Sequence, residues 1–221
     1  QRVLEAHIRK RYDGRDFDTV DEQNQIILAG YGRFGQIIGR FLTAQGVKLT
    51  ILEKDPDQID LLRKFGVKAY FGDASRLDLL QNAGAEKAHM MIIAIADINT
   101  CLDLVTLCRQ HFPHLRIFSR ARNRRHAYEL HKLGVQCFRR DTFDSALAMA
   151  QKIMVALGNS ETDIQSRAAK FIEHDETALR KSFSFFDNER ELIEFSRFNT
   201  EELERLLQED AEDEPQEKLA G

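Results

Sequence analysis

A glycine motif of the form GxGxxG, Gly30–Gly35, follows directly on a run of four apolar residues, Ile26–Ala29. Apolar residues at helical spacing come next. In such a context the first glycine permits a tight turn, the second lets a diphosphate approach the backbone, and the third lets helix pack on strand. The helix N-terminus offers free N–H groups and partial positive charge to phosphate. The motif predicts a nucleotide site, with a Rossmann-like fold whose site is empty as the alternative.

An acidic residue, Glu53, stands eighteen positions after Gly35, at the end of the next predicted strand. A carboxylate there accepts hydrogen bonds from ribose hydroxyls and repels a 2′-phosphate, so NAD, AMP or ATP is favoured over NADP. Asp73 and Ala74 follow the third predicted strand and are expected to border the adenine. The other residues predicted to contact the nucleotide are Tyr31, Arg33, Phe34, Lys54 and Ala96.

Arginines gather after the last two predicted strands: Arg120, Arg122, Arg124 and Arg125, then Arg139 and Arg140. Ligands of open parallel sheets bind at the carboxyl ends of strands. The arginines therefore face either an anionic ligand or solvent, and the sequence favours neither. Tyr128 and Lys132 form a YxxxK pair, which short-chain dehydrogenases use for catalysis. Those enzymes space their glycines differently, so the pair is interpreted as a coincidence on a surface helix.

Six strand patterns alternate with helix patterns up to Leu157. They cover 26–29, 47–52, 67–71, 90–96, 115–119 and 135–138. The helices between them carry start signals, Asp55 before Pro56 and Asp97 before an apolar stripe. Such alternation predicts an α/β protein with a Rossmann-like, doubly wound parallel six-stranded sheet and a C-terminal helical extension.

The predicted organisation places a linker at 1–24, the nucleotide domain at 25–141 and a helix at 142–157. A basic cluster in the linker, Arg9–Arg11, marks either a membrane surface or a solvated helix end. A helical part follows at 158–207, with helices expected at 163–180, 188–198 and 200–207. The acidic tail, 208–221, is predicted to be disordered, most clearly from Glu209 onward.

Composition narrows the function classes. A formal net charge of −4 argues against a general nucleic-acid binder. The longest apolar run, Met90–Ala96, is too short to cross a bilayer. Three cysteines form no CxxC pair, which favours unpaired thiols, with Cys101 and Cys108 as small buried residues. The chain begins with Gln1 and is expected to be part of a longer protein.

Several segments together resemble the cytosolic domain of Kef potassium-efflux systems, within the wider RCK/KTN group. They are Ile27–Gln36, Arg63–Gly66, Tyr70–Ala74, His111–Leu115 and Arg120–Arg122. The resemblance is close over Gln25–Leu157 and looser beyond. It implies a ligand-sensing gate of a potassium/proton antiporter at the cytoplasmic face of the bacterial inner membrane, and no enzyme activity. It also implies a bound adenine nucleotide, AMP or NAD/NADH.

The same resemblance implies partners and a second ligand. Glutathione would close the system from a dimer interface, and glutathione adducts would open it. The partners would be a second copy joined through the helix at 142–157, the antiporter domain of the same polypeptide and an ancillary quinone oxidoreductase, but no nucleic acid. The residues assigned to glutathione are Arg40, Phe65, Arg120, Arg122, Arg140 and Asp175.

Two of these assignments carry specific expectations. Phe65 matches an aromatic residue expected to sense the bulk of an adduct. Asp175 aligns with or near a family asparagine, and a carboxylate there would lose an amide donor and add negative charge. A small NAD-dependent oxidoreductase is the alternative function, although the 64 mostly polar residues after Leu157 provide no recognisable catalytic acid/base with a substrate pocket.

Overall fold

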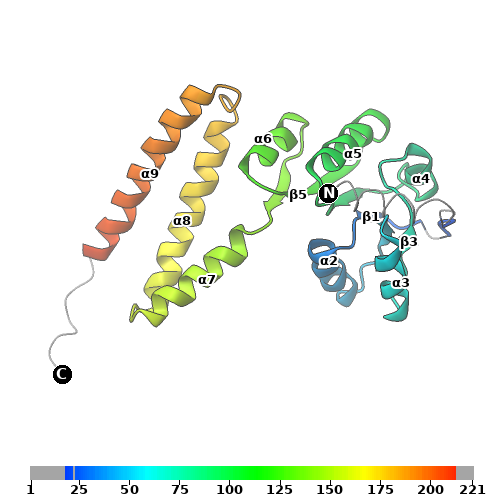
Figure 1. Cartoon of the computed structure of the whole chain (residues 1–221), viewed down its shortest axis with the longest axis horizontal. Helices are drawn as coiled ribbons and strands as arrows, with labels where there is room; N and C mark the ends of the chain where they lie inside the picture. Colours follow the sequence, from blue (N-terminus) through cyan, green and yellow to red (C-terminus); the bar gives the residue numbers. More distant parts are fainter. Residues whose placement is uncertain (1–17, 22, 213–221) are drawn as a thin grey trace, which may run out of the picture. The chain divides into compact units, whose positions relative to one another are not determined.

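The computed structural model describes residues 18–21 and 23–212, in two compact units (Figure 1). Of the described residues, the first unit contains those from 18 to 122 together with 132–139. The second contains 123–131 and 140–212.

The first unit is built on a six-stranded sheet in the order β3-β2-β1-β4-β5-β6. The strands are β1 (Ile26–Ala29), β2 (Thr50–Glu53), β3 (Tyr70–Phe71), β4 (Met90–Ile93), β5 (Arg116–Ala121) and β6 (Cys137–Arg140). Neighbouring strands from β3 through β5 pair in parallel. The doubly wound, six-stranded sheet that the sequence predicts is confirmed, and the structure adds the order of its strands. Strands β2 and β3 are added on one side of β1, whereas β4, β5 and β6 are added on the other. The strand order therefore reverses between β1 and β4, which is where ligands of such sheets bind.

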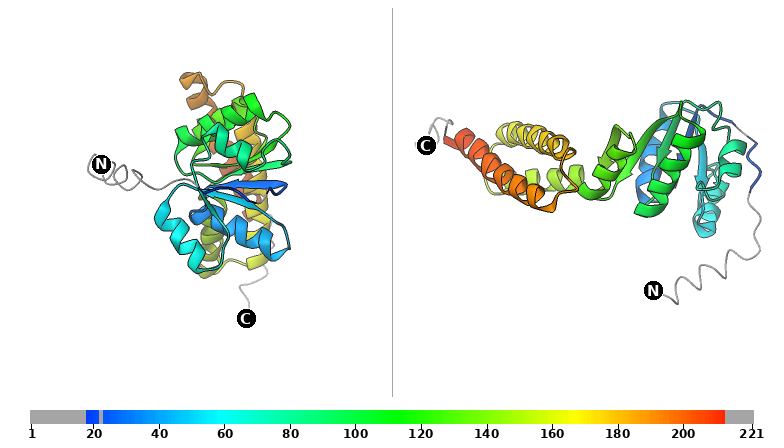
Figure 2. Two further views of the ribbon diagram at one scale, coloured as in Figure 1. Left: turned by 90° about the vertical axis from the view of Figure 1, so that its right-hand side faces the viewer. Right: turned by 90° about the horizontal axis from the view of Figure 1, so that it is seen from above.

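Helices cover both faces of this sheet: α2 (Arg33–Ala44), α3 (Pro56–Lys64), α4 (Leu77–Asn82) and α5 (Ile98–His111). Figure 2 shows α2 and α3 on one face and α5 on the other. Leu28, Ile59 and Phe71 are at most 1% exposed in the core between sheet and helices. The predicted caps are confirmed, because Asp55 accepts hydrogen bonds at the start of α3 and Asp97 at the start of α5.

The segment before β1 lies against the sheet edge. The N–H of Asp18 donates to the carbonyl of Phe71 (3.0 Å), and the Asp18 carboxylate pairs with Arg63 (2.6 Å). Asp21 pairs with Lys68 (3.0 Å). The predicted linker therefore needs correction at residues 18–21, which two ion pairs hold to the domain. The basic cluster Arg9–Arg11 lies outside the described residues.

The second unit is helical. It contains α6 (Arg124–Lys132) up to His131, then α7 (Phe143–Ala156), α8 (Glu161–Ser182) and α9 (Glu189–Glu212). Helix α7 contacts α8, and α8 contacts α9. Helices α6 and α7 thus group with the C-terminal helices, whereas the sequence placed α6 in the nucleotide domain.

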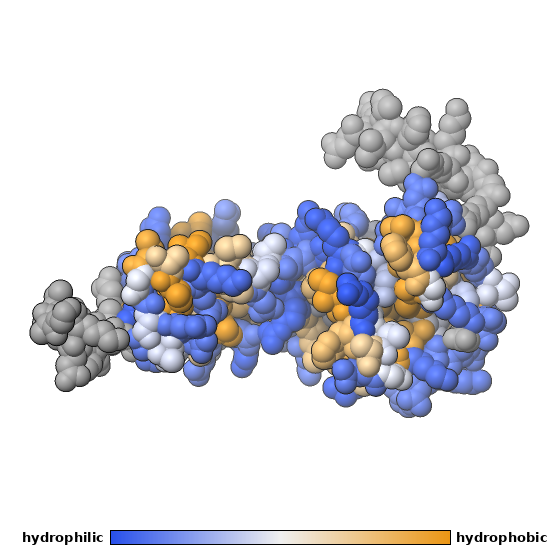
Figure 3. All heavy atoms as spheres, turned by 90° about the horizontal axis from the view of Figure 1, so that it is seen from below, coloured by the Kyte–Doolittle hydropathy of each residue, from blue (hydrophilic) through white to orange (hydrophobic). Residues whose placement is uncertain are grey.

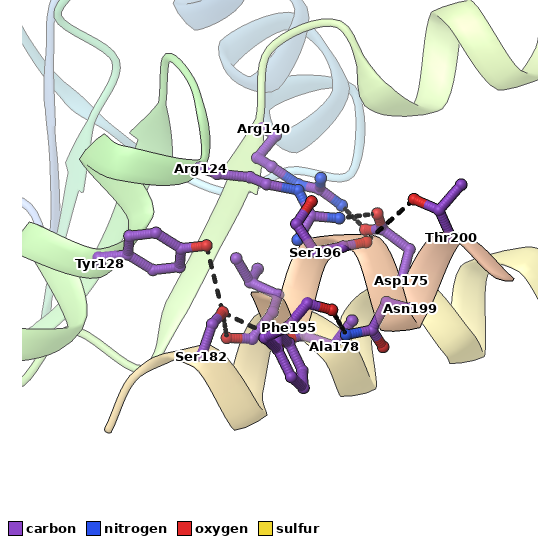
Figure 4. A network of polar contacts seen from close by, with 11 residues as sticks. Arg124, Tyr128, Arg140, Asp175, Ala178, Ser182, Phe195, Ser196, Asn199 and Thr200 are labelled. Carbon is purple, nitrogen blue, oxygen red and sulfur yellow. Dashed lines mark hydrogen bonds and ion pairs between the residues drawn. The ribbon is translucent and has the colours of Figure 1, made fainter. Parts of the chain in front are cut away.

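Helix α9 corrects the prediction of two helices at 188–198 and 200–207, because it continues through Asn199 and Thr200. The side-chain amide of Asn199 donates to the main-chain carbonyl of Phe195 (2.8 Å). The hydroxyl of Thr200 donates to the main-chain carbonyl of Ser196 (3.0 Å; Figure 4). These side chains bond back one turn instead of ending the helix. The helix also includes residues 208–212, which were predicted to be disordered. The rest of the tail, 213–221, lies outside the described residues.

Within the described ranges, no helix is both long and apolar enough to cross a membrane. Cys101 and Cys108 are fully buried, as predicted, and Cys137 is exposed. Burial raises the pKa of the Cys108 thiol to about 12 and also raises the pKa of Cys101. Both buried thiols therefore stay protonated and unreactive at neutral pH.

Candidate functional site

The glycine loop follows β1, at the point where the strand order reverses between β1 and β4. Gly30 has a φ of +87°, and its N–H donates to the carbonyl of Leu52 in β2 (2.8 Å). A Cβ on Gly30 would lie 3.3 Å from Ala94 and Ile95, just after β4. Both the left-handed backbone and the close approach of the β4 end therefore favour glycine here.

The other two glycines of the motif, Gly32 and Gly35, differ in how closely other atoms approach them. A Cβ on Gly35 would lie 2.1 Å from the carbonyl oxygen of Gly30, so a side chain at 35 would push α2 away from the loop. A Cβ on Gly32 would meet nothing within 4 Å. Gly35 therefore serves the packing of helix on strand, whereas the space beside Gly32 is open to a ligand.

Helix α2 begins without the acidic groups that start its neighbours. Its N-cap is Gly32, which makes no side-chain hydrogen bond, and its first turn contains no acid. By contrast, Asp55 caps α3 and Asp97 caps α5. An uncapped N-terminus directs free N–H groups and partial positive charge outward, and Arg33 adds a charge in the first turn. This end of α2 is suited to an anion such as phosphate.

Glu53 ends β2 beside this loop and is 9% exposed. One carboxylate oxygen accepts the N–H of Tyr31 (2.6 Å), and the other accepts the N–H groups of Lys54 (2.8 Å) and Asp55 (2.9 Å). An ionised carboxylate has about four acceptor positions. Three are used to fix the loop, so the oxygen facing Tyr31 keeps capacity for one further donor, such as a ribose hydroxyl.

The rings of the two aromatic residues in the motif, Tyr31 and Phe34, contact other residues of the first unit. The Tyr31 ring is 3% exposed and packs on Gly39, where a Cβ would lie 2.4 Å from the ring. Only the main chain of Tyr31 thus remains for the predicted nucleotide contact, and burial raises the pKa of its hydroxyl. The guanidinium of Arg120 lies 5.5 Å from the centroid of the Phe34 ring. Gly39 was not identified from the sequence, because its role depends on the ring that rests on it.

The remaining predicted nucleotide residues lie in the loops after β2, β3 and β4. The Asp73 carboxylate accepts both the N–H (3.0 Å) and the hydroxyl (2.7 Å) of Ser75, and Ala74 is 5% exposed. Arg122 donates to the carbonyl of Ala96 (3.4 Å). Arg122 therefore lies beside a residue predicted for the nucleotide, although it was assigned to glutathione.

Positive charge also collects near Asp97 at this edge. The pKa of Asp97 is lowered, first by the N–H of Thr100 and then by its hydroxyl, with smaller contributions from the charges of Lys54 and Arg122. Two cations at the carboxyl ends of β2 and β5 favour an anionic ligand there.

The residues predicted to bind glutathione divide between the units. Arg40 and Phe65 belong to the first unit and are exposed, Phe65 by 74%. Arg140 belongs to the second, where it and Arg124 both bond the carboxylate of Asp175 (Figure 4). Arg124 was not assigned to this set, because the sequence gives no sign that it meets a residue 51 positions away. A joint ligand for Arg40 and Arg140 stays a prediction.

Tyr128 of the YxxxK pair is buried, which corrects its assignment to a surface position. It is 4% exposed, and its oxygen accepts the hydroxyl of Ser182 (3.1 Å). Its ring makes an edge contact with Phe183 at 5.9 Å between centroids. These contacts give Tyr128 a structural role in joining α6 to α8. No group of three or more His, Cys, Asp or Glu suited to a metal occurs in the part of the chain that the structure describes.

Two family models match the chain: the TrkA-N domain over residues 26–138 and the potassium efflux system KefB C-terminal domain over 145–220. A glutathione-regulated potassium-efflux system protein KefC from Klebsiella pneumoniae is 47% identical over 172 residues, 76% of this chain and 28% of that protein. The chain thus spans less than a third of the length of this relative.

Solved structures agree with these matches. The Kef C-terminal domain of Shewanella denitrificans in its AMP-bound form is 45% identical, with a TM-score of 0.66, over 72% of this chain and 98% of that one. The TrkA-N domain of the Escherichia coli inner membrane protein ybaL is 28% identical, with a TM-score of 0.54, over 60% of this chain and 98% of that one.

Proposed function

The chain belongs to the family of Kef C-terminal domains built on a TrkA-N domain, and from this premise we propose that it is the nucleotide-binding, ligand-sensing gate of a potassium-efflux system. The transport activity, potassium/proton antiport, would reside in a membrane domain of the same polypeptide. The gate would act at the cytoplasmic face of a bacterial inner membrane. The KefC relatives and the AMP-bound Shewanella domain support this proposal.

The observation that carries the proposal is that the uncapped N-terminus of α2 lies beside the carboxylate of Glu53, which accepts three hydrogen bonds and has room for a fourth. The N-terminus of α2 would hold the phosphate of an adenine nucleotide, and the remaining acceptor position of Glu53 would take a ribose hydroxyl. AMP satisfies both contacts with a single phosphate. NAD or NADH would place its second phosphate and ribose beyond the same loop.

Exchange of Glu53 for glutamine tests this proposal. The amide keeps the size of the side chain but has one acceptor oxygen for three backbone donors and no charge. Losing charged hydrogen bonds costs about 1.5–3 kcal/mol, so we expect Glu53→Gln to weaken AMP binding roughly 10- to 100-fold by calorimetry. Asp57→Asn removes a charge from the exposed first turn of α3 and should bind AMP normally. Equal affinity of Glu53→Gln and the native chain would contradict the assignment.

We further propose that glutathione and its adducts regulate the gate, as the names of the KefC relatives suggest. Glutathione has two carboxylates and one ammonium group, and arginines bind carboxylates by charge-assisted hydrogen bonds. The residues proposed for this role are those that the resemblance assigns, Arg40, Phe65, Arg120, Arg122, Arg140 and Asp175, and the structure adds Arg124 as a second arginine on Asp175. An ancillary quinone oxidoreductase stays a candidate partner from the resemblance alone. A small NAD-dependent oxidoreductase stays the alternative function, and a hydride-transfer assay with the bound nucleotide separates the two.

A homodimer is also proposed, and α7 supplies the argument. None of its residues is buried, and Met149, Ile153 and the adjoining Leu157 are 60%, 53% and 73% exposed. Figure 3 shows hydrophobic side chains at the surface over α7. An exposed apolar surface of this kind usually marks an interface. The proposed occupant is the same helix of a second copy.

Charged residues on α7 should therefore separate the two copies. We expect Met149→Lys with Ile153→Glu to weaken self-association at least about a hundredfold, because each buried apolar side chain contributes about 1.5–3 kcal/mol. Light scattering measures the change. Lys152→Gln alters a polar residue of the same helix and should leave the dimer intact. A native chain that is monomeric at micromolar concentration, with AMP present, would refute the dimer.

A further inference from the structure

Residues 18–21, here called the strap, complete one edge of the sheet. Strand β3 is the outermost strand on its side, and the main-chain groups of such a strand need another segment to cover them. The N–H of Phe71 donates to the carboxylate of Asp18 (2.6 Å), and the carbonyl of Phe71 accepts the N–H of Asp18 (3.0 Å). Asp18 therefore bonds to the edge of β3 much as a residue of a neighbouring strand would.

Polar side chains hold the strap in place. The carboxylate of Asp18 pairs with Arg63 of α3 (2.6 Å), and that of Asp21 pairs with Lys68 (3.0 Å) and accepts the hydroxyl of Tyr70. The side chains of the two ion pairs are 27% to 65% exposed, and ion pairs this exposed contribute little to stability. The strap can thus detach and reattach without disturbing the core of the first unit.

The short strand β3 depends on this contact. It consists of Tyr70 and Phe71, which pair with Leu52 and Glu53 of β2. The loop that follows, 72–75, contains the two residues predicted to border the adenine, and its first N–H donates to the carbonyl of Glu53 (2.9 Å). A strap that fixes Phe71 therefore also fixes the start of the loop beside the nucleotide site.

Helix α3 provides a second connection between the strap and the nucleotide site. Its Arg63 pairs with the strap, whereas the side-chain amide of Gln58 donates to the main-chain carbonyl of Tyr31 in the glycine loop (3.2 Å). The N–H of its N-cap, Asp55, donates to the carboxylate of Glu53 (2.9 Å). One helix thus contacts the strap near its C-terminus and the nucleotide site near its N-terminus.

We propose that the strap attaches reversibly, and that its attachment and nucleotide binding favour each other through β3 and α3. The inference rests on the proposed function, in which the chain before the strap leads to a membrane domain, so that the strap would carry the state of the nucleotide site toward it. When the strap detaches, β3 loses the two hydrogen bonds between Phe71 and Asp18, and the loop 72–75 loosens. The nucleotide then has different affinities for the attached and the detached state, which is the condition for shifting their populations.

Hydrogen exchange of the full chain without nucleotide tests the strap itself. Asp18→Ala with Asp21→Ala removes both carboxylates, and exchange of residues 70–75 should accelerate about three- to tenfold, the range expected from two exposed ion pairs. The control is Asp78→Ala, because Asp78 forms an exposed pair with Arg76 (2.5 Å) that involves no residue of the strap. Unchanged exchange of residues 70–75 in the strap variant would overturn the proposal.

The other side of the contact provides an independent variant. Arg63→Gln with Lys68→Gln removes both cations and leaves the strap unaltered, and it should accelerate exchange of residues 70–75 in the same direction. Combining it with the strap variant should add little, because both break the same contact. Fully additive effects would show that the acids and the bases act separately, which would also overturn the proposal.

Calorimetry with AMP tests the coupling to the nucleotide. Asp18→Ala with Asp21→Ala should weaken AMP binding about fivefold or more, the lower end of typical coupling between sites, whereas Asp78→Ala should bind AMP as the native chain does. Because coupling is reciprocal, AMP should in turn slow exchange of the Asp18 amide in the native chain. Equal AMP affinity of the strap variant and the native chain would overturn the proposal.

The two measurements separate this inference from the proposed function. A native chain that binds no AMP would overturn the proposed nucleotide function and the coupling with it. Faster exchange of residues 70–75 in the strap variant would still show that the strap stabilises this loop. If the native chain binds AMP but the strap variant binds it equally well, the nucleotide function stands and the coupling fails.

Discussion

Replacing Gly35 with alanine is expected to destabilise the first unit by about 3 kcal/mol or more and to abolish nucleotide binding. The added Cβ would lie 2.1 Å from the carbonyl oxygen of Gly30, and this neighbour is backbone that cannot rotate away. Overpacking a core usually costs about 1–3 kcal/mol, and a backbone clash lies at the upper end. Relief requires α2 to move away from β1, which would also misplace the N–H groups offered to phosphate.

Gly32→Ala is the matched comparison for this prediction. A Cβ at 32 meets nothing within 4 Å, and the φ of Gly32, −70°, is accessible to alanine. Urea unfolding followed by circular dichroism should show native-like stability for Gly32→Ala and a clear loss for Gly35→Ala. Equal midpoints for the two variants would show that the close contact of α2 with the loop is not what requires glycine.

The second large effect is expected at Arg140. Removing one partner of a buried ion pair costs about 3–5 kcal/mol, because the other charge stays buried without full compensation. Arg124 still neutralises part of Asp175, so we expect Arg140→Ala to destabilise the second unit by about 3 kcal/mol, the lower end of that range. The loss of the Arg140 contact with Phe143 contributes to this figure.

An exposed ion pair on α8, the helix that contains Asp175, provides the control. Arg180 pairs with Glu176 at 3.1 Å, but its side chain is 71% exposed, and such pairs contribute about 0–1 kcal/mol. Hydrogen exchange of α8 should therefore accelerate strongly in Arg140→Ala and little in Arg180→Ala. Adding Asp175→Ala to Arg140→Ala should cost less than the sum of the single changes. If the two arginine variants behaved alike, Arg140 would have no special role in holding α8.

The features predicted correctly depend on residues close together in the sequence. The buried run Ile26–Ala29, the glycines that follow and the caps at Asp55 and Asp97 each act within a few positions, so their spacing is sufficient. The break predicted between two helices at Asn199 and Thr200 was wrong because it also relied on residues close together in the sequence. Its side chains often end helices, and only the structure shows that they bond back within α9.

The features that were missed are long-range contacts. The packing of Tyr31 on Gly39 could be suspected from a second glycine in α2, but it requires the ring to turn inward. The contact of Arg124 with Asp175 joins segments 51 positions apart, and that of Asp18 with Phe71 joins segments 53 apart. Charge patterns along the sequence do not indicate such pairs, because many acids and arginines could pair equally well.

Calorimetric titration of AMP into the native chain and into Gly32→Ala tests the central claim most directly. If the phosphate lies against the glycine loop at the N-terminus of α2, the native chain binds AMP. The added methyl group would then occupy the space of the ligand and lower the affinity at least about tenfold, the effect of losing about 1.4 kcal/mol. The account predicts this loss in a variant that remains fully folded. A native chain that does not bind AMP, or a Gly32→Ala chain that binds it equally well, would contradict the account.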